Sequence, residues 1–176
     1  MLVKLRSGGR TVTERDALEE LLGCHERIRR FARMAGMLAG ASAAEVAEGA
    51  LATHRYFAIA LPLHAADEDL SFAPRLAYAE PTPEVLAALA EMTHEHELIE
   101  AALAENLPRW LELSQDPARQ AALASGLAAG AATIFALFDT HLEKEERVLF
   151  PAARRSFTPE MIADLGEELR ARRAPA

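Results

Sequence analysis

Apolar residues recur at steps of three and four along most of this chain, which is the spacing of one face of an α-helix. The first such face lies between Thr13, a capping residue with acidic residues close behind it, and Gly40, a residue type that often ends helices. Ser42 and Glu45, three residues apart, predict a capping box at the start of a second helix. The inward positions of the first face, one of them a histidine, are Leu18, Leu21, His25, Ile28, Ala32 and Ala35.

Prolines indicate where the later helices bend, end or begin, because proline lacks the backbone N–H that a helix interior needs. Pro62 predicts a kink in the second helix, and Pro74 and Pro81 predict a connecting loop after it. Pro151 predicts the end of the fourth helix. A capping residue followed by proline predicts a helix start. That pair occurs at Thr82-Pro83, Asp116-Pro117 and Thr158-Pro159.

These elements predict an all-α protein, an antiparallel up-down four-helix bundle with a short extra C-terminal helix. We expect a flexible N-terminal tail over residues 1–12, the bundle over 13–155, and a C-terminal helix that docks on the bundle over 156–176. The composition agrees, because alanine is abundant while the strand-favouring valine, threonine and tyrosine are scarce.

Charge and cysteine content narrow the range of functions. The formal net charge is −8, which argues against a nucleic-acid partner because the phosphate backbone is also negative. The single cysteine, Cys24, excludes an internal disulfide and a thiolate zinc finger, and we expect it to be a buried, inert thiol. The N-terminal residues lack the long apolar segment of a signal peptide, so a cytoplasmic location is expected.

One uncharged stretch, Gln120 to Phe138, is long enough to span a bilayer and contains the spacing Gly126-xxx-Gly130. Alanine and glycine dominate it, and it runs directly into a charged segment with no belt of tryptophan or tyrosine. We therefore expect a buried helix of a soluble protein with no membrane partner. Its small residues would let neighbouring helices approach closely.

An internal repeat carries the chemistry of this sequence. His64 and Glu68 are four residues apart, and His141 and Glu145 repeat that spacing later in the chain, at one constant offset from 64 to 141 and from 68 to 145. Residues four apart share a helix face, so each pair can address one site. Each pair is preceded by a helix with one inward histidine. These two histidines are His25 and His96, which are separated by a similar offset.

Four imidazoles and two carboxylates in a bundle interior predict a metal site, because buried carboxylates are costly without compensation. Nitrogen and carboxylate ligands suit iron, manganese or zinc. Two histidines for each ion and two shared carboxylates predict a dinuclear centre with an open coordination position on each ion. The predicted ligands are His25, His64, Glu68, His96, His141 and Glu145.

Other polar residues are expected to lie outside this site. His54 has no counterpart in the repeat and lies ten residues before His64, so we expect a polar core or edge residue. His94 points away from His96 around the helix, and its acidic neighbours, Glu95 among them, predict a solvated surface. We also expect solvated helix faces at the charged runs 27–30 and 167–173.

The segments CHERI, LPLHAADEDLSFAP, EHELI and HLEKEERVLFP make the chain resemble the hemerythrin-like, or HHE cation-binding, family over roughly residues 14 to 155. The resemblance implies that His25 and His64 bind one iron and that His96 and His141 bind the other. It further implies that Glu68 and Glu145 bridge the two ions together with an oxo or hydroxo group. Oxygen-carrying members have a further histidine one turn before the third-helix ligand, where this chain has Met92.

Two classes of function fit the predicted centre. The leading hypothesis is a non-haem di-iron protein that binds or senses oxygen, nitric oxide or iron, with metal ions and a small diatomic ligand or peroxide as its partners. The alternative is a di-iron enzyme that acts on peroxide or iron(II). A third hypothesis treats the metal as a structural staple of an interaction domain. Because all three use the same ligands, the sequence does not separate them.

Overall fold

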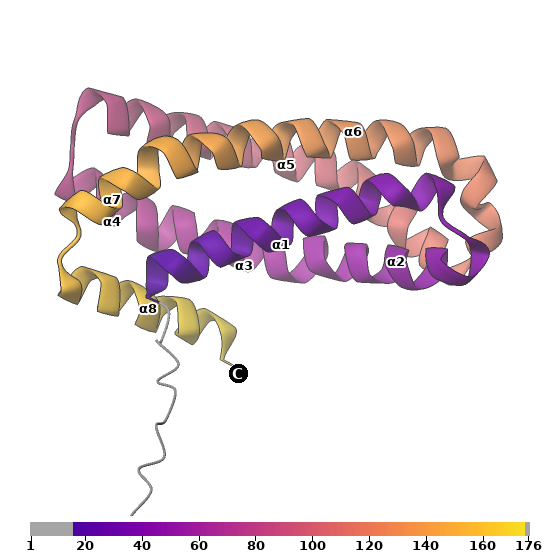
Figure 1. Cartoon of the computed structure of the whole chain (residues 1–176), viewed down its shortest axis with the longest axis horizontal. Helices are drawn as coiled ribbons and strands as arrows, with labels where there is room; N and C mark the ends of the chain where they lie inside the picture. Colours follow the sequence, from indigo (N-terminus) through magenta and orange to yellow (C-terminus); the bar gives the residue numbers. More distant parts are fainter. Residues whose placement is uncertain (1–15, 175–176) are drawn as a thin grey trace, which may run out of the picture.

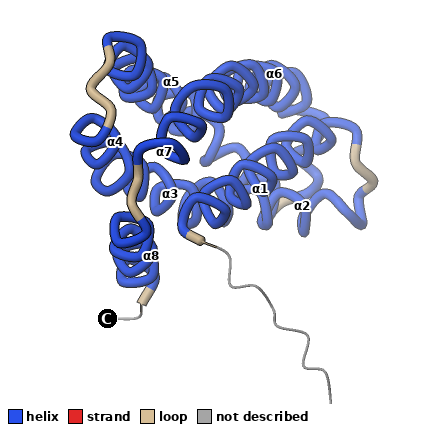
Figure 2. Tube along the Cα trace, turned by 60° about the vertical axis from the view of Figure 1, so that its left-hand side comes forward, coloured by secondary structure: helices blue, strands red, loops and turns tan. Residues whose placement is uncertain are grey.

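The computed structural model describes residues 16–174, and these residues are helical apart from short turns, with no strand among them (Figure 2). The predicted all-α fold is confirmed. The predicted tail over 1–12 and the helix start at Thr13 lie outside the described residues. The α-helices are α1 (Ala17–Met37), α2 (Ala43–Arg55), α3 (Leu61–Asp67), α4 (Ala73–Ala79), α5 (Pro83–Gln115), α6 (Gln120–Lys144), α7 (Phe150–Ser156) and α8 (Pro159–Arg173).

Short π-helical turns join several of these helices into longer rods. They lie at Tyr56–Ala60 between α2 and α3, at Glu68–Phe72 between α3 and α4, and at Glu145–Leu149 between α6 and α7. Figure 1 shows α1, the α2–α4 rod, α5 and the α6–α7 rod lying side by side along the length of the molecule. The shorter α8 packs against α1 and α3 near one end of these rods. The described chain is therefore a helical bundle with one additional helix.

The π-helical turns explain why two predicted helix ends are wrong. Each turn ends two residues before a proline, at Pro62, Pro74 and Pro151. In each turn the residue before the proline donates its N–H to the carbonyl five residues back rather than four. This wider turn changes the hydrogen-bond register, and the helix continues past a residue that has no N–H. Consequently the helix runs through Pro74 to Ala79, where a loop was predicted, and through Pro151 to Ser156.

Two predicted helix starts, Thr82-Pro83 and Thr158-Pro159, are confirmed, and the starts of α1 and α2 differ in detail from the prediction. Thr82 and Thr158 each accept a hydrogen bond from the backbone N–H three residues on, at 3.3 Å. The first described helix is capped by Asp16, which accepts from the N–H of Glu19 at 2.9 Å. Ser42 occupies the predicted N-cap position of α2 but does not cap it, because its hydroxyl donates to the Glu45 carboxylate instead.

Two apolar clusters fill the bundle, and the polar residues of the predicted metal site separate them along the helices. One cluster contains Ile28, Ile99 and Phe138, together with the fully buried Trp110. The other contains side chains from both ends of the chain, such as Leu21 and Leu165. On α1, for example, the ligand candidate lies between Leu21 and Ile28. The site thus lies between two apolar clusters of the bundle core.

The helix α6 is less buried than predicted. Within residues 16–174, one continuous helical segment is long and apolar enough to cross a membrane: Pro117–Ser156, which includes α6 and α7. An 18-residue window of this segment has a mean hydropathy of 1.9, and 22% of the window is buried. Length and composition are weak evidence for a membrane span by themselves. One face of the helix packs inward, and its outward face is mostly alanine. Alanine has a high helix propensity, and its small side chain exposes little apolar surface. The cytoplasmic location and the lack of a membrane partner stay predictions. The inward residues are Leu127, Ala131, Ile134 and Phe138.

The predicted close approach of helices occurs at one glycine of α6. A Cβ atom at Gly130 would overlap the side chain of Asn106 on α5, whereas a Cβ atom at Gly126 would lie 3.6 Å from Arg109, an ordinary contact. Asn106 is buried and donates to the backbone carbonyl of Ala102 at 2.7 Å. The two glycines therefore have different roles, and only Gly130 is required for helix packing.

Candidate metal centre

Four separate helical rods bring the six predicted ligands to one place in the bundle interior. His25 comes from α1, His96 from α5 and His141 from α6. His64 lies on α3, and each glutamate is the first residue of a π-helical turn, Glu68 after α3 and Glu145 after α6. Five of the six side chains are at most 4% exposed, and that of His96 is 14% exposed.

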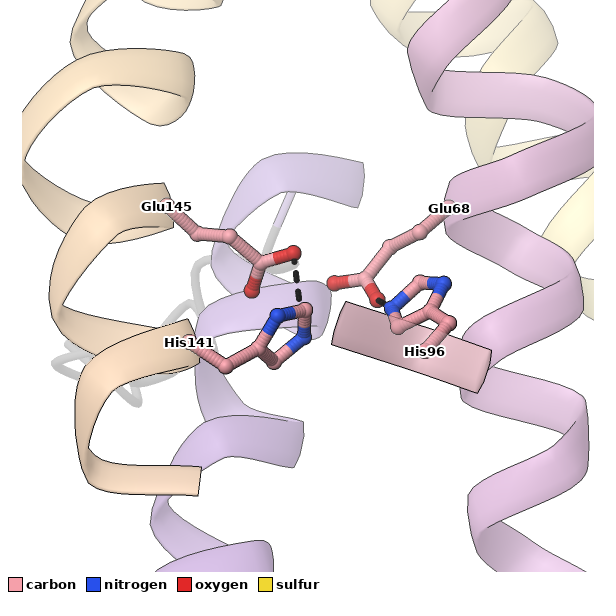
Figure 3. A group of neighbouring side chains, drawn as sticks. All are labelled: Glu68, His96, His141 and Glu145. Atoms are coloured by element: carbon pink, nitrogen blue, oxygen red, sulfur yellow. Dashed lines mark ion pairs between the residues drawn. The ribbon is translucent and has the colours of Figure 1, made fainter. Parts of the chain in front are cut away.

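Glu68 lies between three of the imidazoles. Its Oε1 atom is 3.1 Å from Nε2 of His64 and 3.5 Å from Nε2 of His25. Its Oε2 atom is 3.4 Å from Nε2 of His96 (Figure 3). One oxygen of this carboxylate therefore faces the His25 and His64 pair, and the other oxygen faces the opposite side of the site.

Glu145 has a matching position. Its Oε2 atom is 3.2 Å from Nε2 of His25, and its Oε1 atom is 3.4 Å from Nε2 of His141. Figure 3 shows the Glu68 and Glu145 carboxylates pointing toward each other from opposite rods. The two glutamates stand at equivalent places in the repeat, and each is the first residue of its π-helical turn, Glu68–Phe72 or Glu145–Leu149. The repeat read from the sequence thus extends to the backbone conformation.

Three of the imidazoles are oriented by a carboxylate on the outer side of the ring. Nδ1 of His25 donates to Glu146 at 2.9 Å, and Arg29 binds both oxygens of Glu146 at 2.8 and 3.0 Å. Such a contact fixes the ring orientation and leaves Nε2 directed inward. Arg29 belongs to the charged run 27–30, so the prediction that this run is simply solvated is wrong at this residue.

His96 and His141 have outer partners of the same kind. Nδ1 of His96 is 3.0 Å from Oδ1 of Asp69, and Nδ1 of His141 is 3.1 Å from Oε2 of Glu95. Lys144 in turn donates to the other oxygen of Glu95 at 2.5 Å. Glu95 was predicted to lie on a solvated surface, and the half-buried contact with His141 corrects that prediction. Sequence reasoning did not identify Asp69, Glu95 or Glu146 as part of the site.

Burial and charge shift the pKa values of these groups in opposite directions. Burial lowers the pKa of His64 to about 4. Burial also opposes protonation of His25 and His96, but the carboxylates that face them raise both pKa values to about 10. The imidazoles around Glu68 hold its pKa well below the usual range despite its burial, whereas burial and the nearby Glu68 charge raise the pKa of Glu145.

Several buried polar atoms at the centre have no hydrogen-bond partner. They are Nε2 of His25, both ring nitrogens of His64, and both carboxylate oxygens of Glu68 and of Glu145. Buried polar groups in proteins are almost always satisfied, so a cluster of orphaned acceptors indicates a site for a cation. The ligand atoms form two groups that share Glu68, and within each group all atoms lie within 4.8 Å of one another. The groups are His25, His64 and Glu68, and Glu68, His96, His141 and Glu145.

The remaining candidate residues lie outside these groups. The side chain of His94 is 68% exposed and lies 3.5 Å from Glu97. His54 is half-buried and belongs to neither ligand group. Cys24 is buried, which raises the pKa of its thiol. Met92 is fully buried in an apolar cluster, so the turn before His96 on α5 directs a thioether rather than an imidazole into the core.

The helix α8 is fixed to the rod that carries Glu68. Asp67, the neighbour of Glu68, is fully buried. Its Oδ1 atom is 2.6 Å from Nη1 of Arg172, and its Oδ2 atom is 2.5 Å from Nη2 of Arg173. Glu168 pairs with Arg75 at 2.7 Å on the same rod. The prediction of a solvated helix face over residues 167–173 is therefore wrong at Glu168, Arg172 and Arg173, whose ion pairs dock α8 beside the site, whereas Glu167 and Arg170 are exposed.

A helical bundle whose interior holds paired imidazole and carboxylate ligands defines a class of metal-binding proteins. Comparison with known families gives the same result: the model of the hemerythrin HHE cation-binding domain matches residues 16–153. The chain therefore belongs to the hemerythrin HHE cation-binding family. A search of curated proteins finds no match to it. The helix α8 lies beyond the matched region.

Proposed function

We propose that this chain is a non-haem di-iron protein that holds two ions within an antiparallel up-down four-helix bundle. His25 and His64 would bind one ion, and His96 and His141 would bind the other. The observation that carries this proposal is the arrangement of the two carboxylates. In both Glu68 and Glu145, one oxygen faces the first imidazole pair and the second oxygen faces the other pair.

Iron is the metal that family membership favours, and the donor set fits it. Four nitrogen and four carboxylate oxygen atoms form a borderline-hard set that manganese and zinc would also accept. By resemblance to the family, an oxo or hydroxo group would complete the bridge between the ions. When bound, iron would supply reversible redox and small-ligand chemistry. The protein contributes the orientation of three of the imidazoles, through Asp69, Glu95 and Glu146, and the burial of the ligand candidates.

We propose that the physiological ligand is small, such as oxygen, nitric oxide or iron itself, and that the chain binds or senses it. Two imidazoles and two shared carboxylates leave each ion with fewer protein ligands than six, so a small molecule can bind. Met92 adds no donor where oxygen carriers have a histidine, which favours sensing, iron handling or a reaction with peroxide over reversible oxygen carriage. The domain limits also stay proposals: a bundle over 13–155 and a docked C-terminal helix over 156–176.

Iron content of six histidine variants tests the ligand assignment. Each histidine is replaced by alanine, and each variant is reconstituted with iron(II) under anaerobic conditions and analysed for iron per chain. We expect lower occupancy for the four ligand histidines and wild-type occupancy for His54→Ala and His94→Ala. Loss of iron from His94→Ala together with full occupancy in His96→Ala would disprove the assignment on α5.

A turnover assay separates binding from catalysis. The iron-loaded protein is mixed with excess peroxide, and consumption is followed per chain. A binding or sensing protein should consume at most a stoichiometric amount. Repeated turnover would instead support an enzyme that acts on peroxide. Saturated coordination, with no spectral response to oxygen or azide, would support a structural metal.

A further inference from the structure

A large pocket opens between the α2–α3 part of one rod and the helix α5, with a volume of about 560 Å³. Its floor is apolar and buried, and includes Ile28, Phe57, Leu103 and Phe138. Four different helical segments thus contribute to one hydrophobic cavity. Pockets of a few hundred to about 1,000 Å³ with apolar walls are the usual binding sites for organic small molecules.

The pocket is open to solvent on one side and reaches the candidate metal centre on the other. Its rim includes Pro62, Leu70 and Ala104, all on the surface, and the side chain of Leu70 is 66% exposed. Three of the proposed ligand residues line its inner part: His64, His96 and His141. The groove between α1 and α3, in contrast, is covered by α8. The pocket therefore gives the centre an approach from solvent.

The size of the pocket exceeds what the small ligands of the proposed function need. A water molecule occupies about 30 Å³ in the liquid, and a diatomic molecule is of similar size. A route for such ligands would need only a narrow passage. An exposed leucine at the mouth and a deep apolar floor are typical of a site that takes up a larger hydrophobic molecule.

The charges around the pocket restrict the chemistry of its occupant. No lysine or arginine is among the described residues that line it, whereas Asp69 and Glu100 are. The Asp69 carboxylate is held by His96, and that of Glu100 lies at the exposed rim. An anionic molecule such as a fatty acid would find no lysine or arginine in this lining, and the imidazole of His96 already pairs with the carboxylates of Glu68 and Asp69. A charged headgroup would also be buried against the apolar residues of the floor, which is unfavourable.

We infer that this pocket binds an uncharged, largely apolar organic molecule and places it against the imidazoles of the metal centre. The inference rests on the proposed function for the role of that molecule, as substrate or effector of the centre, but binding itself depends on the pocket alone. The occupant lies beside His64, His96 and His141.

Two fluorescent probes test the inference on the whole chain. N-phenyl-1-naphthylamine is uncharged, and 1-anilinonaphthalene-8-sulfonate carries a similar aromatic system with a negative charge. We expect the uncharged probe to bind with one site per chain, and the anionic probe to bind at least about tenfold more weakly, since a buried unpaired charge costs more than the 1.4 kcal/mol that corresponds to a factor of ten. Equal binding of the two probes would overturn the assigned ligand class.

Tryptophan substitutions locate the probe. Ala58 and Ala104 lie on opposite walls of the pocket, and Ala101 is an exposed alanine on the same helix as Ala104 that does not line it. Ala58→Trp and Ala104→Trp should each weaken binding of the uncharged probe by about tenfold, because the indole ring fills space that the probe would occupy. Ala101→Trp should leave binding unchanged. Wild-type affinity in both pocket variants would overturn the location.

Measuring probe binding and iron uptake on the same protein separates this inference from the proposed function. Probe binding without any uptake of iron would refute the proposed function and leave the pocket standing. Uptake of iron without probe binding would refute the pocket alone. In cobalt(II)-loaded protein, the bound probe should shift the visible absorption of the metal. An unchanged spectrum at probe saturation would refute contact with the centre.

Discussion

Glu146→Gln tests whether the outer carboxylates support metal binding. His25 is the one ligand candidate among the described residues that contacts Glu146, whose carboxylate accepts a hydrogen bond from Nδ1 of His25 at 2.9 Å. The two terminal nitrogens of the Arg29 guanidinium also donate to Glu146. Glutamine keeps the size and shape of the side chain but removes its charge. The variant therefore weakens the hold on one imidazole and leaves the six proposed ligands in place.

The expected magnitude follows from the contacts that are lost. A hydrogen bond to a charged group contributes about 1.5–3 kcal/mol, and one between neutral groups about 0.5–1.5 kcal/mol, so the change costs about 1 kcal/mol or somewhat more. Loss of an outer partner typically reduces metal affinity by about 10- to 100-fold. We expect a reduction near the lower figure, confined to the ion bound by His25, because Asp69 and Glu95 still orient the other pair.

A competition titration against a chromophoric chelator measures this change. Glu143→Gln is the matched control, because Glu143 is a neighbouring glutamate that pairs with Arg147 on the exposed surface at 2.9 Å. The control should bind both metal ions with wild-type affinity. If Glu146→Gln binds them as tightly as the control does, the outer carboxylates do not orient the ligands and the reasoning is refuted.

Three other predictions concern packing, protons and docking. Gly130→Ala should destabilise the protein by about 1–2 kcal/mol, because the added methyl group overlaps the side chain of Asn106 on α5. Gly126→Ala should stabilise the protein by up to about 1 kcal/mol, because alanine has the higher helix propensity. Thermal unfolding of both variants checks this contrast. Without bound metal, His25 and His96 have pKa values raised to about 10, so their contribution to stability is complete below about pH 6.5 and lost as the pH rises toward 10. Metal affinity should change in the opposite sense over that window, because deprotonation frees the same imidazoles, and a fall in affinity with rising pH would contradict the assignment. Asp67→Asn should release α8 and lower the free energy of unfolding by about 2–4 kcal/mol, which faster hydrogen exchange in α8 would reveal.

The repeat made the six inward residues predictable from sequence. A spacing of four places His64 beside Glu68 whatever else the chain does, and a second copy of that spacing at His141 and Glu145 makes coincidence an inadequate explanation. Helix geometry likewise separated His94 from His96. These inferences depended on local spacing, which a helix converts directly into a shared face.

The residues that sequence reasoning missed act across long separations. Glu146 meets a histidine 121 positions away, and Glu95 meets one 46 positions away. No local spacing indicates such a contact, and both glutamates resemble the many acidic residues of exposed helix faces. The π-helical turns were missed for a different reason. Proline normally predicts a helix end, and only the register of the hydrogen bonds shows that the helix continues through Pro74.

The most direct test of the central claim is the number of metal ions that one folded chain binds. The chain is reconstituted anaerobically with iron(II), freed of excess metal and analysed for iron and protein together, with circular dichroism as a check that it is folded. Two ions per chain are expected, because Glu68 and Glu145 each present one oxygen to each imidazole pair. One ion or none in fully helical protein would contradict the dinuclear centre.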